Sequence, residues 1–254
     1  MQFCLELAFG VLLALAFVPK APVGVLFYRV MGTSALVCVG VALAVPIGTH
    51  ARGIDDAAVV LGLLAVITYP VYSGPVRGPR WAVALGLALV GTAAGVGVLI
   101  RESGAAASPI ELTVATATAL ATGTVAGSVG LAMVLGHWYL TVPKLPIRHL
   151  GRLNLVTIVS MVLSAALVGT TCLLFQGRLE AANTPLFGAT GLFYLGTRLA
   201  VGLAVPLLFA AMAQSSLRYQ NTRSATGILY ASTVLVLIGT AVSVSLQDTY
   251  GVPL

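Results

Sequence analysis

The fold is decided by a long apolar stretch near the middle of the chain, which reads IELTVATATALATGTVAGSVGLAMVLGHWY over residues 110–139. A transmembrane helix needs about 20 predominantly apolar residues, so this stretch is long enough to cross a bilayer with some tilt. It is rich in glycine, alanine and threonine, small residues that let helix backbones approach closely in lipid. The stretch therefore predicts a transmembrane helix at the centre of a helix bundle.

The composition of the whole chain agrees with a membrane environment. Of the 254 residues, 59% are hydrophobic and only 8% are charged, whereas a soluble domain carries roughly 25% charged residues. The formal net charge of +6 does not come from one basic patch, because the lysines and arginines are dispersed between the apolar runs. We therefore expect a lipid bilayer around the chain and no nucleic-acid partner.

Other apolar runs of similar length lie on both sides of this stretch. Together they predict an all-α transmembrane bundle of about eight helices, in one integral membrane domain that covers residues 1–254. The connections are short, so no soluble catalytic domain is expected between the spans. The predicted spans are 2–18, 25–47, 57–74, 82–100, 110–139, 155–175, 186–212 and 227–246.

The basic residues predict the orientation of these spans. Cytoplasmic loops carry an excess of lysine and arginine. With their flanks, the odd-numbered connections hold nine such residues and the even-numbered ones three, which predicts a multi-pass protein of the cell inner (cytoplasmic) membrane with both termini outside. The nine are Lys20, Arg29, Arg77, Arg80, Lys144, Arg148, Arg152, Arg218 and Arg223, and the three are Arg52, Arg101 and Arg178.

Two similar segments suggest an internal duplication. Val18-Pro19-Lys20-Ala21-Pro22 leaves the first predicted span, and Val142-Pro143-Lys144-Leu145-Pro146 leaves the fifth. Pro70 and Pro206 lie in the third and seventh spans. This pattern favours a tandem repeat of four plus four helices in parallel orientation, with repeats 1–109 and 110–254. The alternative is that Val-Pro-Lys-x-Pro is an ordinary exit from a membrane helix, since proline ends helices and lysine favours the cytoplasmic face.

Arg198 is the most informative charge, because it lies near the middle of the seventh predicted span. An ionised side chain at that depth is costly and marks a functional candidate. Tyr194 lies one helical turn away on the same face. Arg198 could hold a substrate carboxylate or a quinone carbonyl, or it could be a structural ion pair. Glu6 and Glu111 are the acidic residues expected within its reach.

The second candidate site is the segment Gly136–Leu140 at the cytoplasmic end of the fifth span. It contains His137 and Tyr139, which could bind a quinone headgroup or carry a proton. The alternative is an interfacial aromatic belt in which the histidine is bonded to a neighbouring carbonyl. Haem is not favoured, because His50 is expected on the opposite membrane face and His149 in a connection.

A third candidate lies at the entrance to the last span, where Arg218, Asn221, Arg223 and Ser224 follow one another closely. A basic helix entrance with free amide groups could bind an anionic headgroup or contact a partner. The simpler interpretation is helix capping by Asn221 or Ser224, combined with the positive charge of a cytoplasmic loop.

Sequence patterns for catalysis and metal binding are missing from the chain. Cys4, Cys38 and Cys172 form no CxxC pair, which gives no support to a metal site or a disulfide. No Walker A, GxGxxG or HExxH motif occurs, and the spans contain no paired carboxylates. We therefore predict no catalytic residue.

Two function hypotheses remain. The first is a membrane subunit that scaffolds a larger, redox or electron-transfer assembly of membrane or membrane-associated subunits, with part of a quinone site near His137, Tyr139, Tyr194 and Arg198. The second is a small secondary transporter whose substrate path lies near Arg198 and the threonine-rich fifth span. A transporter should open a water-accessible cavity to the midplane near Arg198 and the fifth span, so packed side chains sealing these positions would count against it. A redox-assembly subunit should copurify with partner chains or a lipid-soluble cofactor.

Overall fold

The computed structural model describes residues 2–18, 23–44, 54–142 and 145–254, and among these residues the secondary structure is helical without strands. The all-α prediction is confirmed. The helices are α1 (Gln2–Ala16), α3 (Val25–Ala44), α4 (Ile54–Ser73), α5 (Pro79–Glu102), α6 (Pro109–Thr141), α7 (Arg148–Leu174), α8 (Gln176–Ala181), α9 (Ala189–Leu199), the π-helical segment η1 (Ala200–Ala204), α10 (Val205–Arg218) and α11 (Thr222–Tyr250).

Six helical segments of the described chain are long and apolar enough to cross a membrane. They are α3, α5, α6, α7, α11 and the continuous helix Ala189–Arg218 that α9, η1 and α10 form together. This is the architecture of a multi-pass membrane protein. Two further helical stretches, Gln2–Ala16 and Leu61–Ser73, are apolar but shorter. The predicted number of eight spans is therefore not confirmed by helix length alone.

Several helices extend beyond the predicted spans. The predicted starts at residues 155 and 227 correspond to helices that begin at Arg148 and Thr222. Hydropathy detects the lipid-facing part of a helix, whereas the first turns of α7 and α11 carry arginines at the end of the bundle. Basic side chains can occupy such turns because they snorkel to the polar interface.

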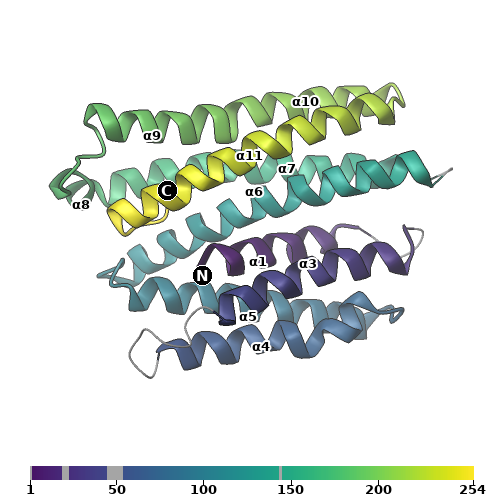
Figure 1. Ribbon diagram of the computed structural model, residues 1–254, viewed down its shortest axis with the longest axis horizontal. Helices are drawn as coiled ribbons and strands as arrows, with labels where there is room; N and C mark the ends of the chain where they lie inside the picture. Colours follow the sequence, from purple (N-terminus) through teal and green to yellow (C-terminus); the bar gives the residue numbers. More distant parts are fainter. Residues whose placement is uncertain (1, 19–22, 45–53, 143–144) are drawn as a thin grey trace.

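The long helices lie side by side along the long axis of the molecule, and successive ones run in opposite directions (Figure 1). In α6, 78% of the most apolar window is buried, against 33–44% in the other five candidate spans. The helix packs against α1, α5, α7 and α11. The prediction that this stretch lies at the centre of the bundle is confirmed.

The two halves of the chain use the same set of helix neighbours. In the first half, α1 and α4 each pack against both α3 and α5. In the second half, α6 and α10 each pack against both α7 and α11. The halves meet where α1 packs along α6.

Glycines allow the backbones of α1 and α6 to touch. A Cβ atom on Gly10 would overlap the carbonyl oxygen of Gly123, and one on Gly127 would overlap the backbone of Gly10. A Cβ on Gly123 would likewise overlap the carbonyl of Glu6. A second close crossing joins Gly202 of η1 to Gly239 of α11. Small residues at helix crossings are the usual means of close packing in lipid.

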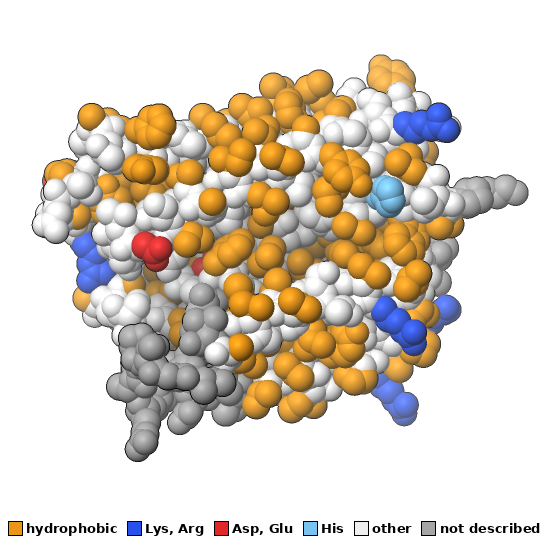
Figure 2. Space-filling view, in the orientation of Figure 1, with side chains coloured by type: hydrophobic (Ala, Val, Ile, Leu, Met, Phe, Trp, Pro, Cys, Tyr) orange, Lys and Arg blue, Asp and Glu red, His pale blue; other side chains and the backbone are white. Residues whose placement is uncertain are grey.

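Charged side chains gather at the two ends of the bundle, and the visible face between them is largely apolar (Figure 2). The end formed by the start of α3 and the α4–α5, α6–α7 and α10–α11 connections, called here the basic end, carries only positive charges among the described residues. These are Arg29, Arg77, Arg80, Arg148, Arg152, Arg218 and Arg223. The opposite end carries both signs, with Arg101, Glu102, Glu111, Arg178, Glu180 and Asp248.

The α1–α6 contact gives a direct stability prediction. We expect Gly10→Ala to lower the free energy of unfolding by about 1–3 kcal/mol or more, because the added methyl group forces two backbones apart. Gly40→Ala in α3 is the matched control, since a Cβ there meets no atom within 4 Å. Thermal unfolding in detergent measures both variants. Equal stability of the two variants would contradict the close crossing.

Candidate functional site

Arg198 is fully buried and is the largest side chain with no exposed surface among the described residues. It is near the C-terminal end of α9, directly before the π-helical segment η1. Pro206 has no backbone N–H to bond the carbonyl four residues before it, and Val205 N–H bonds Ala200, five residues back. The missing N–H of Pro206 therefore contributes to the local widening of the helix, and π segments of this kind are frequent at functional sites.

The guanidinium of Arg198 points into the second half of the bundle. Its Nη2 donates to Thr122 Oγ1 of α6 at 3.0 Å and, more weakly, to Ser164 Oγ of α7 at 3.4 Å. Nε and Nη1 are buried and have no hydrogen-bond partner among the described residues. A buried guanidinium that lacks part of its hydrogen bonding is energetically expensive. Nε and Nη1 of Arg198 could therefore still bind a hydrogen-bond acceptor.

Glu6 of α1 supplies the nearest opposing charge. Of the two predicted acidic residues, Glu6 is the one that interacts electrostatically with Arg198. Its side chain is buried and accepts a hydrogen bond from Gln2 Nε2 at 2.7 Å, and Gln247 of α11 donates to Gln2 at 2.7 Å. Glu111 instead lies in the first turn of α6 and accepts from the backbone N–H of Ala107.

Most hydroxyl groups near Arg198 are satisfied within the protein. Thr122 and Thr124 donate to carbonyls one turn earlier on α6, and Thr118 also meets Thr171 of α7 at 2.8 Å. This is the usual back-bonding of threonine in membrane helices. Thr118, Thr122, Ser128 and Ser164 are all at most 3% exposed. Packed side chains therefore surround Arg198 on this side of the bundle interior.

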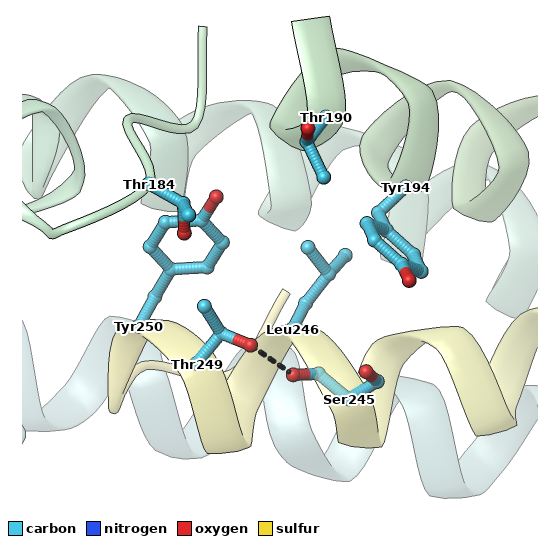
Figure 3. A pocket seen from close by; sticks show the side chains of 7 residues that line it. All are labelled: Thr184, Thr190, Tyr194, Ser245, Leu246, Thr249 and Tyr250. Atoms are coloured by element: carbon cyan, nitrogen blue, oxygen red, sulfur yellow. Dashed lines mark hydrogen bonds between the residues drawn. The ribbon is translucent and has the colours of Figure 1, made fainter. Parts of the chain in front are cut away.

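A small pocket opens at the end of the bundle where α9 begins and α11 ends, called here the outer pocket. Its volume is about 240 Å³. Tyr194 of α9 and Tyr250 of α11 stand at its two sides, with Leu246 between them (Figure 3). The remaining lining side chains all carry hydroxyl groups: Thr184, Thr190, Ser245 and Thr249. Tyr194 thus lies between open space and Arg198, which is one helical turn deeper.

His137 and Tyr139 lie far from Arg198, towards the basic end. His137 is exposed, and its Nδ1 lies 3.3 Å from the hydroxyl of Tyr230 on α11. Tyr139 donates instead to the carbonyl of Pro146 at 2.5 Å. Fifteen residues of α6 separate His137 from Thr122, a rise of about 22 Å. The four predicted site residues therefore do not form one site. Tyr194 and Arg198 lie together, whereas His137 lies beside Tyr230 at the other end of α6. Tyr139 contacts neither place and instead bonds the α6–α7 connection.

The predicted cluster at the start of α11 forms a helix cap. The side chain of Asn221 accepts from the backbone N–H of Ser224 at 3.0 Å, as an N-cap residue does. Arg218 ends α10, Arg223 is the second residue of α11, and both are exposed. The geometry gives Asn221 and Ser224 a capping role and leaves the two arginines available to an anionic headgroup or a partner.

Several polar side chains that contact the candidate site residues could not be predicted from the sequence. Tyr230 was not expected beside His137, and Gln2 and Gln247 were not expected to connect α1 with α11. Each contact joins helices that are distant in sequence, so no local sequence pattern could predict it. The described residues contain no group of three or more potential metal ligands.

Comparison with models of known protein families, with curated proteins and with solved structures gives no match for this chain.

The buried charges of Glu6 and Arg198 predict an asymmetric response to mutation. We expect Glu6→Gln to lower stability by about 1–3 kcal/mol, because it leaves the buried guanidinium without a counter-charge. Arg198→Met should lower stability by less, because the Glu6 carboxyl left behind can take up a proton and become neutral, whereas a guanidinium keeps its charge. The double variant should regain the stability that Glu6→Gln loses. Thermal unfolding of the four proteins measures this, with the exposed Glu102→Gln as control, and strictly additive effects would contradict the coupling.

Proposed function

We propose that the chain crosses the cytoplasmic membrane eight times, with both termini outside. The alternating direction of successive helices supports this, because it brings the beginning of α1 and the end of α11 towards the same end of the bundle (Figure 1). α1 and α4 pack against the longer helices α3 and α5 and would share their environment. The basic end would face the cytoplasm, since its described charges are all positive.

The equivalent helix neighbours support a four-plus-four repeat in parallel orientation. Under this proposal α1, α3, α4 and α5 correspond to α6, α7, α9–α10 and α11. The two helices at the join run in parallel, with Glu6 opposite Gly123 and Gly10 opposite Gly127. The Val-Pro-Lys-x-Pro match would instead pair Glu6 with Gly130, two turns further along α6. The proposed repeat therefore concerns the arrangement of the helices. The first half would be shifted relative to the second by about two helical turns along the membrane normal.

For activity, we propose a membrane subunit that scaffolds a larger redox or electron-transfer assembly and offers a quinone contact at its surface. The sealed midplane carries this proposal: packed side chains surround Arg198 and the polar groups of α6. Such an interior suits a rigid support better than a conduit. Apolar residues along α7 and α11 that lie on the outer surface, such as Val159 and Leu237, would contact lipid or other subunits.

The exposed His137–Tyr230 pair is the proposed quinone contact. An imidazole N–H and a phenol can both donate to a quinone carbonyl. The two side chains come from α6 and α11, so their spacing is fixed by helix packing. Tyr194 and Arg198 do not join this contact, because Thr122, which accepts a hydrogen bond from Arg198, lies about 22 Å from His137 along α6.

Loss of either side chain should weaken quinone binding. We expect His137→Ala and Tyr230→Phe each to reduce ubiquinone or menaquinone bound to the purified protein severalfold, by about 1 kcal/mol for one lost hydrogen bond. Tyr219→Phe is the matched control, since Tyr219 lies near the same end and is 83% exposed. Extraction followed by chromatography quantifies the quinone. Unchanged quinone in both variants would remove this site.

A second candidate function is secondary transport, which the surroundings of Arg198 favour. The buried guanidinium with two unpartnered nitrogens, the adjacent π segment and the outer pocket beyond Tyr194 together would suit an occluded anion-binding site. The sealed midplane would then be one state of an alternating cycle.

Accessibility labelling separates the two functions. For a scaffold, a cysteine at Ser164 in a background lacking Cys4, Cys38 and Cys172 should stay unlabelled by a water-soluble maleimide at all times. For a transporter, the same position should label in part and be protected by the anion carried. Cysteine at the exposed Thr184 is the positive control. Labelling of Ser164→Cys would overturn the scaffold proposal.

A further inference from the structure

An apolar groove runs along the outer surface of the bundle between α1 and α7, and α6 forms its floor. It consists of two contiguous cavities of about 480 and 360 Å³ that share Leu13, Thr124, Ser160 and Leu163. Phe9 of α1 and Phe17, directly after α1, form one rim, and residues of α7 from Arg152 to Leu167 form the other. We call this surface the α1–α7 groove.

The groove is shaped for a hydrocarbon chain. From Arg152 to Leu167 it extends about 22 Å along α7, a large part of the roughly 30 Å hydrocarbon core of a bilayer. The hydroxyls of Thr124 and Ser160 donate to carbonyls of their own helices, so they offer no free donor to a polar ligand. A partner helix is about 10 Å wide, whereas each cavity has the size of a small-molecule site.

The mouth of the groove carries a positive charge. Arg152 lines the cavity at the basic end and is exposed, and Arg148 lies one helical turn further out on the same face. No acidic residue lies at the basic end among the described residues. A counter-charge for these guanidinium groups must therefore come from outside the bundle. Arginine is well suited to phosphate, and basic pockets between membrane helices bind anionic lipid headgroups.

We infer that the α1–α7 groove binds one anionic diacyl glycerophospholipid, with an acyl chain between Leu13 and Leu163 and its phosphate at Arg152. The lipid fills the space that α1 and α7 leave over α6, beside the join between the two halves of the chain. This site does not depend on the proposed quinone contact, which lies between α6 and α11.

Native mass spectrometry of the full chain in detergent tests the site, with phosphatidylglycerol and phosphatidylcholine of identical acyl chains as probes. The wild type should retain phosphatidylglycerol in preference to phosphatidylcholine. Arg152→Gln should reduce that preference about fivefold, which is the change in affinity expected from losing one basic residue near an anionic headgroup. Arg223→Gln, at the same end but on α11, is the matched control and should keep the preference.

A second variant tests the chain-binding part with the charge intact. Ala117 is partly exposed on the groove floor, so Ala117→Phe should block the deep end and reduce retention of both lipids. Equal retention of the two lipids by the wild type would overturn the inference, as would equal effects of Arg152→Gln and Arg223→Gln. Crosslinking of Leu163→Cys in native membranes to a protein, rather than to a lipid, would also overturn the inference.

Discussion

The structure depends on one backbone contact, the crossing of α1 over α6 at Gly10, Gly123 and Gly127. Lipid surrounds helices as favourably as apolar side chains do, so close packing has to replace the hydrophobic effect as the cohesive force between membrane helices. Only glycine permits the approach seen at this crossing. This crossing is the closest approach between the two four-helix groups, and the packing of α5 against α6 adds to it.

The same crossing determines where the buried charges meet. Glu6 is one turn before Gly10 on α1, and its carbonyl lies against Gly123 of α6. Thr122, the neighbour of Gly123, accepts a hydrogen bond from Arg198. The close approach thus brings a carboxylate from the first half of the chain near a guanidinium from the second. Burial of either charge is costly in a low-dielectric interior, and the attraction that the crossing allows between Glu6 and Arg198 offsets part of that cost.

Much of the fold could be predicted from the sequence, because hydropathy and small-residue content are local properties. The apolar, small-residue stretch 110–139 correctly predicted a central helix. The residue type and position of Asn221 correctly predicted the N-cap of α11. The Tyr230–His137 pair and the α1–α7 groove could not be predicted, because they depend on which helices become neighbours. The starts of α7 and α11 were missed, because their arginine-containing first turns remain helical beyond the apolar core. Tyr139 and His137 are close in sequence, yet helix geometry directs them to different partners.

The two halves differ in chemistry while sharing an arrangement of neighbours. The second half contains Arg198, the π segment before Pro206 and the threonine-rich face of α6. The corresponding helix of the first half, α4, has Pro70 but no basic residue and remains α-helical around it. A proline alone therefore does not produce the widened turn. In the second half the close approach of Gly202 to Gly239 lies beside it, whereas in the first half Gly91 of α5 approaches the backbone of α4 at Leu61, away from Pro70. The buried charge of Arg198 is therefore a feature of the second half alone, since α4 of the first half meets a similar set of helix neighbours without a basic residue.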